Sequence, residues 1–392
     1  MPVSRKIADF IDRASWIRAM FETGAKLKAE KGAENVFDFS LGNPILDPPE
    51  AFYEVMSRLN ADRSPMAHGY MPNAGYPQVR AKVAAHLSKQ SGVNLDENDV
   101  LMTVGAGGGL NVVLKTILDP GAEVVVPTPY FVEYDFYLDN HGGKIVRVPT
   151  HEDFTLDLSA LKAAITDKTY AILLNNPNNP TGAVYARGEL EQLAAMLTQK
   201  GQRLGRPIYL ISDEPYRQIA YDGIQVPDIF ALYPQSLVVT SFSKSLSLAG
   251  ERIGYVAVHP KIADKKPLMG GMVLCNRILG FVNAPGLMQK AVAELLEITS
   301  DMTLYAKKRE LICQVLTAAG FTYVKPMGAF YVFPQSPIPD DVKFVKAALA
   351  ENLLLVPGSG FMGPGHFRIA FCVANEVIER SAKAFKRVRE RF

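Results

Sequence analysis

The stretch TSFSKSLSLAGERIGY, residues 240–255, sets Lys244 among serines directly after the apolar residues LVV. The hydroxyl groups of Ser241 and Ser243 suit a phosphate group, and so does Arg252, because a guanidinium can bind phosphate in bidentate fashion. Partial burial beside Arg252 would lower the pKa of Lys244, and a neutral amine can attack a carbonyl to form an imine. Taken alone, Lys244 is better explained as a lysine at a strand end whose amine reaches water.

A second group of reactive side chains lies in ISDEPYR, where Asp213 follows the apolar run PIYLI. A carboxylate at the end of a buried strand needs a cationic partner, or it takes up a proton. Tyr216 adds a phenol three residues later. On its own, Asp213 is explained equally well as a helix N-cap.

Two turn-forming segments could present backbone and amide groups to a ligand. TVGAGGGLN (103–111) places glycines between an apolar run and a helical pattern, so backbone N–H groups there could bind a phosphate. Leu110 stands where a dinucleotide motif needs glycine, and a tight turn alone is an equally good interpretation. NNPNNPTG (175–182) could fix the amide of Asn179, although a plain turn explains this segment better when it is taken singly.

Short apolar runs alternate with helical patterns from about residue 100. The predicted strands are 100–105, 123–129, 170–177, 207–215, 237–243 and 252–258. Several lack polar alternation, which is typical of strands covered on both faces. Helical spacing recurs between them, for example at 107–118 and 189–201. The fold class is therefore α/β, with a mainly parallel sheet and helices on both faces. Ligands of such sheets gather at the carboxyl ends of the strands, where the polar residues above stand.

The pattern changes after about residue 290. A long helical pattern (287–320) leads to an apolar run (328–334), a helix at 340–352, further strands in LLLVPGSG and HFRIAFCV, and a final helix. These elements predict a smaller α+β domain. We expect a large domain at 45–290 and a small domain formed by 1–44 together with 291–392.

Composition excludes several classes of protein. The 392 residues are 48% hydrophobic and 21% charged with a net charge of +2, so nothing indicates binding to nucleic acid or to a membrane surface. The three cysteines lack the paired spacing of a metal site, and we expect reduced, mostly buried thiols and no metal. Charged residues interrupt the N-terminal segment, which is unlike a signal peptide, and we expect a cytoplasmic location.

Taken together, the polar segments match the requirements of one cofactor. A phosphate site, a lysine amine, an acid for a pyridinium nitrogen, and a phenol and an amide for a ring hydroxyl are the requirements of pyridoxal 5′-phosphate (PLP). Each segment is weak evidence singly, but the set favours a PLP site.

In its motifs the chain closely resembles the class I/II aminotransferases, which are fold-type I PLP-dependent transferases related to aspartate aminotransferase. The resemblance covers nearly the whole chain, with the motifs in the expected order: SLGNP (40–44), YMPNAGYPQVR (70–80), PTPYFVEY (127–134), NNPTG (178–182), SDEPY (212–216), SFSKSLSLAGERIGY (241–255) and FRIAF (367–371).

The resemblance implies a role for each polar residue around the cofactor. Lys244 would form the imine with PLP and then move the proton between the substrate Cα and the cofactor, and Asp213 would pair with the pyridine nitrogen. Tyr216 and Asn179 would bind the ring hydroxyl. The aromatic ring stacked on the cofactor would be Phe131, with Tyr130 as the weaker candidate. The phosphate would be held by Ser241, Ser243, Arg252 and the backbone at Ala106 and Gly107.

The same resemblance implies the substrate contacts and a partner. Arg368 would bind the substrate α-carboxylate, with Gly42 and Asn179 beside it, because a planar guanidinium matches a carboxylate. Tyr70 would reach the phosphate of a neighbouring subunit. The implied assembly is a homodimer with shared active sites.

The expected reaction moves the amino group of an L-amino acid to a 2-oxo acid in a ping-pong mechanism through pyridoxamine phosphate. Aspartate-preferring relatives often have a cation in the phosphate loop at or near the position of Gly107, and GAGGG has none. Aspartate, alanine, aromatic and other neutral donors therefore stay open, and Arg277 is a cation that the sequence cannot place.

Two other functions deserve comparison. A PLP-dependent carbon–sulfur β-lyase of the same fold would use the same lysine and cofactor. A non-enzymatic regulator built on this fold would need a DNA-binding domain, and about forty residues before SLGNP are too few for one.

Overall fold

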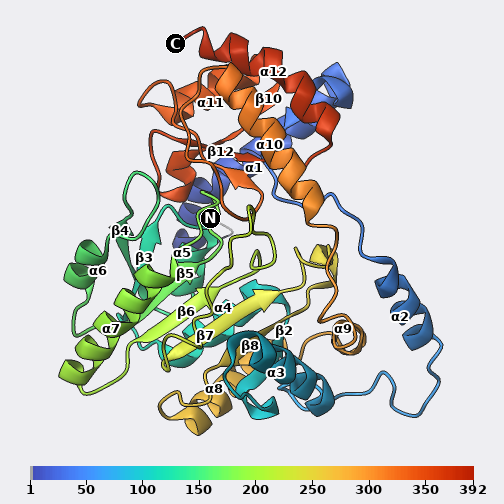
Figure 1. Cartoon of the computed structure of the whole chain (residues 1–392), viewed down its shortest axis with the longest axis vertical. Helices are drawn as coiled ribbons and strands as arrows, with labels where there is room; N and C mark the ends of the chain where they lie inside the picture. The colour runs from blue at the N-terminus through green and yellow to red at the C-terminus, as the bar shows by residue number, and fades with distance from the viewer. Residues whose placement is uncertain (1–2) are drawn as a thin grey trace.

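The computed structural model describes the backbone of residues 3–392. It also describes the side-chain surroundings of these residues, except at 12–23, 25 and 33. Its centre is a seven-stranded sheet (Figure 1). Only β8 runs antiparallel to its neighbours, so the predicted mainly parallel sheet is confirmed. In spatial order the strands are β2 (Val100–Thr103), β8 (Gly254–Val258), β7 (Ser236–Ser241), β6 (Tyr209–Asp213), β5 (Thr169–Asn175), β3 (Glu123–Thr128) and β4 (Lys144–Pro149).

The sheet is covered on both faces, which explains its apolar strands. On β5, Ile172 and Leu174 belong to one buried cluster, while Ala171 and Leu173 belong to the other. The helices that contribute to the first cluster are α2 (Glu50–Asn60), α3 (Pro77–Ser91), α6 (Leu158–Ala164), α7 (Arg187–Leu204) and α9 (Gly286–Val292). Those that contribute to the second are α4 (Gly105–Ile117), α5 (Glu133–Asp139) and α8 (Lys265–Ile278).

Strand β4 was not predicted. It is an edge strand in which Lys144 and Arg147 interrupt the apolar residues, and most of its side chains are incompletely buried. Edge strands often carry such charges, which discourage pairing with another chain. An apolar run is therefore a poor guide to a strand in this position.

A smaller group of elements lies at one end of the sheet, at the top of Figure 1. It has its own buried cluster and two short sheets. Its strands are β1 (Phe37–Asp38), β9 (Tyr331–Val332), β10 (Leu353–Leu354), β11 (Val356–Pro357) and β12 (Phe367–Ala370). Its helices are α10 (Thr303–Ala318), α11 (Asp341–Leu349) and α12 (Asn375–Arg389). Single 3₁₀ turns occur at Ala33–Asn35, Glu97–Asp99, Ala249–Glu251 and Gly358–Phe361.

The helical pattern at 287–320 forms two helices, α9 and α10, rather than one. Asp301 ends the break between them, since its carboxylate accepts hydrogen bonds from Thr303 N (3.0 Å) and Thr303 Oγ1 (2.5 Å). Helix α9 packs in the cluster of the large sheet and α10 in that of the smaller group. The expected domain bounds stay a prediction, and Met1 and Pro2 lie outside the described residues.

Helix α1 (Arg5–Lys31) connects the two groups of elements. Near its start, Lys6 forms an ion pair with Asp139 of α5. Near its end, Lys28 Nζ lies 2.7 Å from the carboxylate of Asp38. Among the residues described, no helix has the length and apolar character needed to cross a membrane.

Candidate active site

A cavity of about 320 Å³ opens where β5, β6 and β7 end beneath the smaller group of elements. The last residues of these strands, Asn175, Asp213 and Ser241, all line it. This is the edge at which open α/β sheets bind ligands. The predicted site residues brought together here are Gly42, Ala106, Gly107, Phe131, Asn179, Asp213, Tyr216, Ser241, Ser243, Lys244, Arg252 and Arg368.

Asp213 is buried at the end of β6 without a cationic partner. Its Oδ2 accepts a 2.5 Å hydrogen bond from Tyr134 Oη and a 3.4 Å bond from Asn175 Nδ2, while its Oδ1 has no partner among the described residues. Burial, against the hydrogen bond from Tyr134 and with a contribution from Glu214, raises the pKa of Asp213 to about 7. The described segment between β6 and β7 contains no helix, so the N-cap interpretation of Asp213 is wrong. The carboxyl group is held ready for a hydrogen-bonding or cationic ligand.

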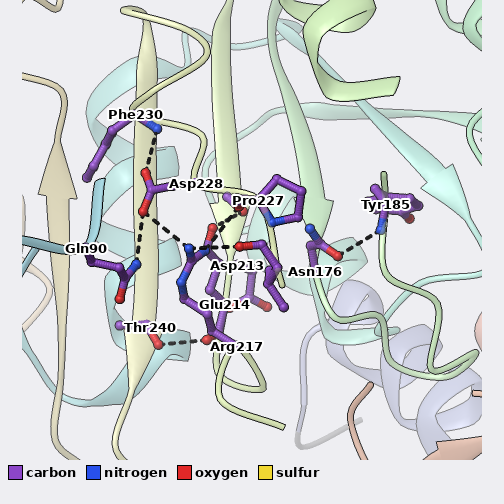
Figure 2. A network of polar contacts seen from close by, with 12 residues as sticks. Gln90, Asn176, Tyr185, Asp213, Glu214, Arg217, Pro227, Asp228, Phe230 and Thr240 are labelled. Carbon is purple, nitrogen blue, oxygen red and sulfur yellow. Dashed lines mark hydrogen bonds and ion pairs between the residues drawn. The ribbon is translucent and has the colours of Figure 1, made fainter. Parts of the chain in front are cut away.

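Arg217, four residues after Asp213, forms its ion pairs with other acids. Figure 2 shows Arg217 between two acids, with Nη1 2.9 Å from Glu214 and Nη2 3.3 Å from Asp228. Thr240 Oγ1 donates to the backbone oxygen of Glu214 (2.9 Å), which ties β7 to the segment after Asp213. This network fixes the backbone around Asp213 and leaves its carboxyl group to the cavity.

We expect the cofactor-free protein to lose stability as the pH rises. The pKa of Asp213 is about 7 in the folded chain, whereas the ordinary value is 3.8, so the folded state holds the proton more tightly. The contribution of this group to the free energy of unfolding is greatest below pH 4 and is lost as the pH rises through 7. Urea unfolding at pH 5.5 and 8.0 should show a fall of roughly 2 kcal/mol that Asp213→Asn lacks. An equal fall in both proteins would contradict the assignment.

Lys244 is partly buried and its amine points to the carbonyl of Gly42, at 2.8 Å. Its Nζ lies 6.0 Å and 5.5 Å from the ring centroids of Tyr216 and Phe330. Burial lowers the pKa of Lys244 to about 8; Cys372 opposes this shift, and Arg252 and Arg368 contribute to it. A substantial neutral fraction near physiological pH makes this amine a nucleophile and a base.

One corner of the cavity is suited to a phosphate. Helix α4 begins at Gly105 with a φ of +74°, and a Cβ on this residue would lie 2.8 Å from Nη2 of Arg252. Glycine therefore lets the arginine approach the first turn of the helix. Ser241 and Ser243 line the same cavity as Arg252 and Ala106. Backbone N–H groups, hydroxyls and a guanidinium thus form one anion site.

Arg368 is buried on β12, between the rings of Tyr331 and Phe361, whose centroids lie 4.8 Å and 4.5 Å from its guanidinium carbon. Its Nη1 donates to Asn179 Oδ1 (3.1 Å) and its Nη2 to the carbonyl of Ser40 (2.6 Å). Its Nε has no partner in the described part of the chain. The guanidinium is thereby held in a fixed plane beside the cavity, as a carboxylate receptor requires.

Three residues named from the sequence, two expected at the site and one left unplaced, do not line this cavity. Tyr130 does not line the cavity, because its hydroxyl donates to Asp135 (2.7 Å) and accepts from Arg147 (2.8 Å) behind it. Of the two aromatic candidates, Phe131 lines the cavity and Tyr130 does not, so we keep Phe131 as the proposed stacking residue. Tyr70 is 91% exposed and lines a separate hollow. Arg277 is exposed on α8 and does not line the cavity of its own chain.

Sequence reasoning missed several residues of this site. Tyr134 and Asn175 contact Asp213, and Tyr331 Oη lies 2.9 Å from Tyr216 Oη. Asn175 could have been found as the last residue of an apolar strand, and Tyr134 from its place in PTPYFVEY. Tyr331 carries no local signal, because it comes from the smaller group of elements. The three cysteines are free and buried, as expected.

Comparisons with known proteins agree with this geometry. A family model described as aminotransferase class I and II matches residues 34–385. Aspartate aminotransferase of Pyrococcus abyssi is 32% identical over 95% of this chain and 95% of its own length. Aspartate/prephenate aminotransferase of Thermus thermophilus is 31% identical over 92% of this chain and 93% of its own. The crystal structure of an amino transferase from Eubacterium rectale superposes with a TM-score of 0.97 at 37% identity, covering 100% of this chain and 99% of that one.

Proposed function

The chain belongs to the class I and II aminotransferases, and on this premise we propose that it moves the amino group of an L-amino acid to a 2-oxo acid with PLP as its cofactor. The observation that carries the proposal is the convergence of Lys244, Asp213 and Arg368 on one cavity. An amine, an acid and a carboxylate receptor are the three groups that this chemistry needs.

The residues of the cavity fit PLP. Asp213 Oδ1 is a buried acceptor with no partner among the residues that the structure describes, as a pyridine nitrogen that carries a proton would require. Arg252 and the first turn of α4 offer an anion site, and a side chain at Gly105 would fill it. Phe131 supplies an aromatic wall and Tyr216 a phenol. Together these groups would hold the ring, the phosphate and the ring hydroxyl.

When bound, PLP supplies the carbonyl that takes up the amino group and a ring that withdraws electrons from the substrate. The residues of this chain would do the rest. We assign Lys244 to hold the cofactor covalently and to move a proton at the substrate Cα, since its lowered pKa lets it serve as both base and acid. Asp213 would keep the ring nitrogen protonated. Arg368, with Asn179 and Gly42 beside it, would orient the α-carboxylate.

The β-lyase alternative is not favoured, because the relatives named above are aminotransferases. The two reactions have different products, and an assay of both tests the proposal. An aminotransferase consumes a 2-oxo acid in step with the donor and releases no ammonia. Release of ammonia and pyruvate from a sulfur amino acid, without dependence on an added 2-oxo acid, would overturn it.

We also propose a homodimer in which Tyr70 completes the phosphate site of the partner. Within one chain the phenol is 91% exposed, and the hollow around it includes exposed Met66 and His68. Apolar side chains that gather in one exposed patch often mark a subunit interface, and Met66, Tyr70 and Met71 line the same hollow. The cytoplasmic location expected from the sequence stays a prediction.

Hybrid dimers test whether the sites are shared. Tyr70→Phe alone should weaken PLP binding by about tenfold, because one hydrogen bond to a charged group is lost. A hybrid of one Tyr70→Phe chain and one Lys244→Ala chain should regain one site with normal PLP affinity, since Lys244 and Tyr70 then meet across the interface. Tyr53→Phe, which alters a phenol on α2, is the control. A hybrid with the weakened affinity would show that Tyr70 acts within its own chain.

A further inference from the structure

Five charged side chains line the cavity of the described chain, and the proposed function uses four of them. Arg252, Lys244, Asp213 and Arg368 have roles in binding the cofactor or the α-carboxylate. The fifth is Glu133, at the start of α5. None of the assigned roles explains a carboxylate in this position.

The geometry of α5 directs Glu133 into the cavity. Tyr134 and Leu138 are buried against the large sheet. Phe136 contacts Phe10 of α1, with ring centroids 4.9 Å apart, and so faces another way. Glu133 and Tyr137 are one turn apart on the remaining face, and both line the cavity.

Glu133 has unused hydrogen-bonding capacity. No hydrogen bond or ion pair joins its carboxylate to any residue in the described part of the chain, although the side chain is partly buried. Burial raises the pKa of Glu133; burial also raises the pKa of Tyr137, with the carboxylate of Glu133 contributing to that shift. A partly desolvated carboxylate gains most from a ligand that brings a positive charge and N–H donors.

In the described part of this chain, the cations that line the cavity already have other partners or roles. A Cβ on Gly107 would lie 2.9 Å from Tyr137 Oη, so the phenol occupies the space in front of this residue. Arg368 is fixed by Asn179 and Ser40, and Arg252 lies at the phosphate corner. A donor that ends in a carboxylate would therefore face Glu133 without a compensating charge from these residues.

We propose that Glu133 is a specificity-determining residue that selects donors whose side chain ends in a cationic nitrogen and disfavours donors that end in a carboxylate. This inference rests on the proposed function and names its donor class. Phe131 and Tyr137 give the cavity aromatic walls beside Glu133, which suit the methylene groups that precede such a nitrogen. The two relatives described above are named for aspartate, a donor that ends in a carboxylate, so the proposed preference differs from theirs.

Binding of ligands that lack an α-amino group tests the proposal apart from the transfer of that group. Pentanoate, 5-aminopentanoate and glutarate share five carbons and one carboxylate for Arg368, but end in a methyl, an ammonium or a second carboxylate. Calorimetry on the holoenzyme should give a Kd for 5-aminopentanoate about tenfold below that for pentanoate, and a weaker Kd for glutarate. Glu133→Gln should remove most of both differences, and Glu133→Lys should reverse their order. Equal ratios in the wild type and both variants would overturn the proposal, as would preference for glutarate in the wild type.

The matching amino acids give the kinetic test. In the half-reaction, ornithine should have a specificity constant about tenfold above that of norvaline, and glutamate should fall below glutamine. Glu133→Gln should reduce the ratio of the specificity constants for ornithine and norvaline, and it should raise the specificity constant for glutamate. The specificity constant for norvaline should change less than about twofold. Glu152→Gln, at an exposed residue outside the cavity, is the control. If norvaline reacts and residue 133 does not alter the ratios, only the donor class fails; if no amino acid reacts, the proposed function fails.

Discussion

Replacing Lys244 with alanine is expected to lower kcat by ~10⁴-fold or more with every donor. The amine is the only lysine lining the cavity in the described chain, and burial brings its pKa to about 8. Its loss removes both the covalent attachment of PLP and the group that moves a proton at the substrate Cα. The measurement is single-turnover conversion of bound cofactor, together with borohydride reduction and peptide mass spectrometry to detect the attachment.

A second variant separates charge from chemistry. Lys244→Arg keeps a cation near the carbonyl of Gly42 but lacks an amine that can be neutral at physiological pH, so it should be as inactive as Lys244→Ala. Lys200→Ala, which removes a lysine on α7 far from the cavity in the structure, should retain activity. Normal turnover by Lys244→Arg would show that charge alone is needed, and normal turnover by Lys244→Ala would remove Lys244 from the mechanism.

The sequence was most informative where strands are buried. Strands β5, β6 and β7 were predicted because both of their faces are covered, so that they form apolar runs. The polar residue that ends such a run is conspicuous, and Asp213 was placed correctly for this reason. Edge strand β4 was missed because its charged residues break the run. The break between α9 and α10 was missed because residues on both sides of it keep helical spacing while packing in different clusters.

Contacts between distant segments could not be predicted from local patterns. Tyr134 donates to Asp213 across 79 positions of sequence, and Tyr216 meets Tyr331 across 115. Such pairs depend on the topology of the sheet and on how the smaller group of elements covers it. Glu133 lies within PTPYFVEY, one of the motifs that carry the family resemblance. Its place in the cavity becomes evident only from the contacts of Tyr134 and Phe136, which fix the orientation of α5.

The burial of Arg368 has a larger consequence than its single charge suggests. A surface ion pair contributes about 1 kcal/mol or less, because water screens it and two side chains must be ordered. Arg368 is already ordered by Asn179, Ser40 and two aromatic rings, so a substrate carboxylate meets a guanidinium whose geometry needs no further fixing. Truncating one partner of such a buried, hydrogen-bonded pair typically costs 2–5 kcal/mol.

Arg368→Ala should therefore lower kcat/KM for amino acids and 2-oxo acids by roughly 10²–10³-fold while PLP stays bound. Arg368→Lys should recover only part of this loss, since an ammonium cannot reproduce the two parallel hydrogen bonds of a guanidinium. Donors without an α-carboxylate, such as simple primary amines, distinguish a carboxylate receptor from a merely structural arginine. The slow half-reaction of these amines should be nearly unchanged by Arg368→Ala. Arg380→Ala, which alters an exposed arginine of α12, is the control and should leave all rates unchanged. If amines and amino acids lost rate equally, Arg368 would support the shape of the site rather than bind the substrate, and orientation of the α-carboxylate would have to be assigned to another group.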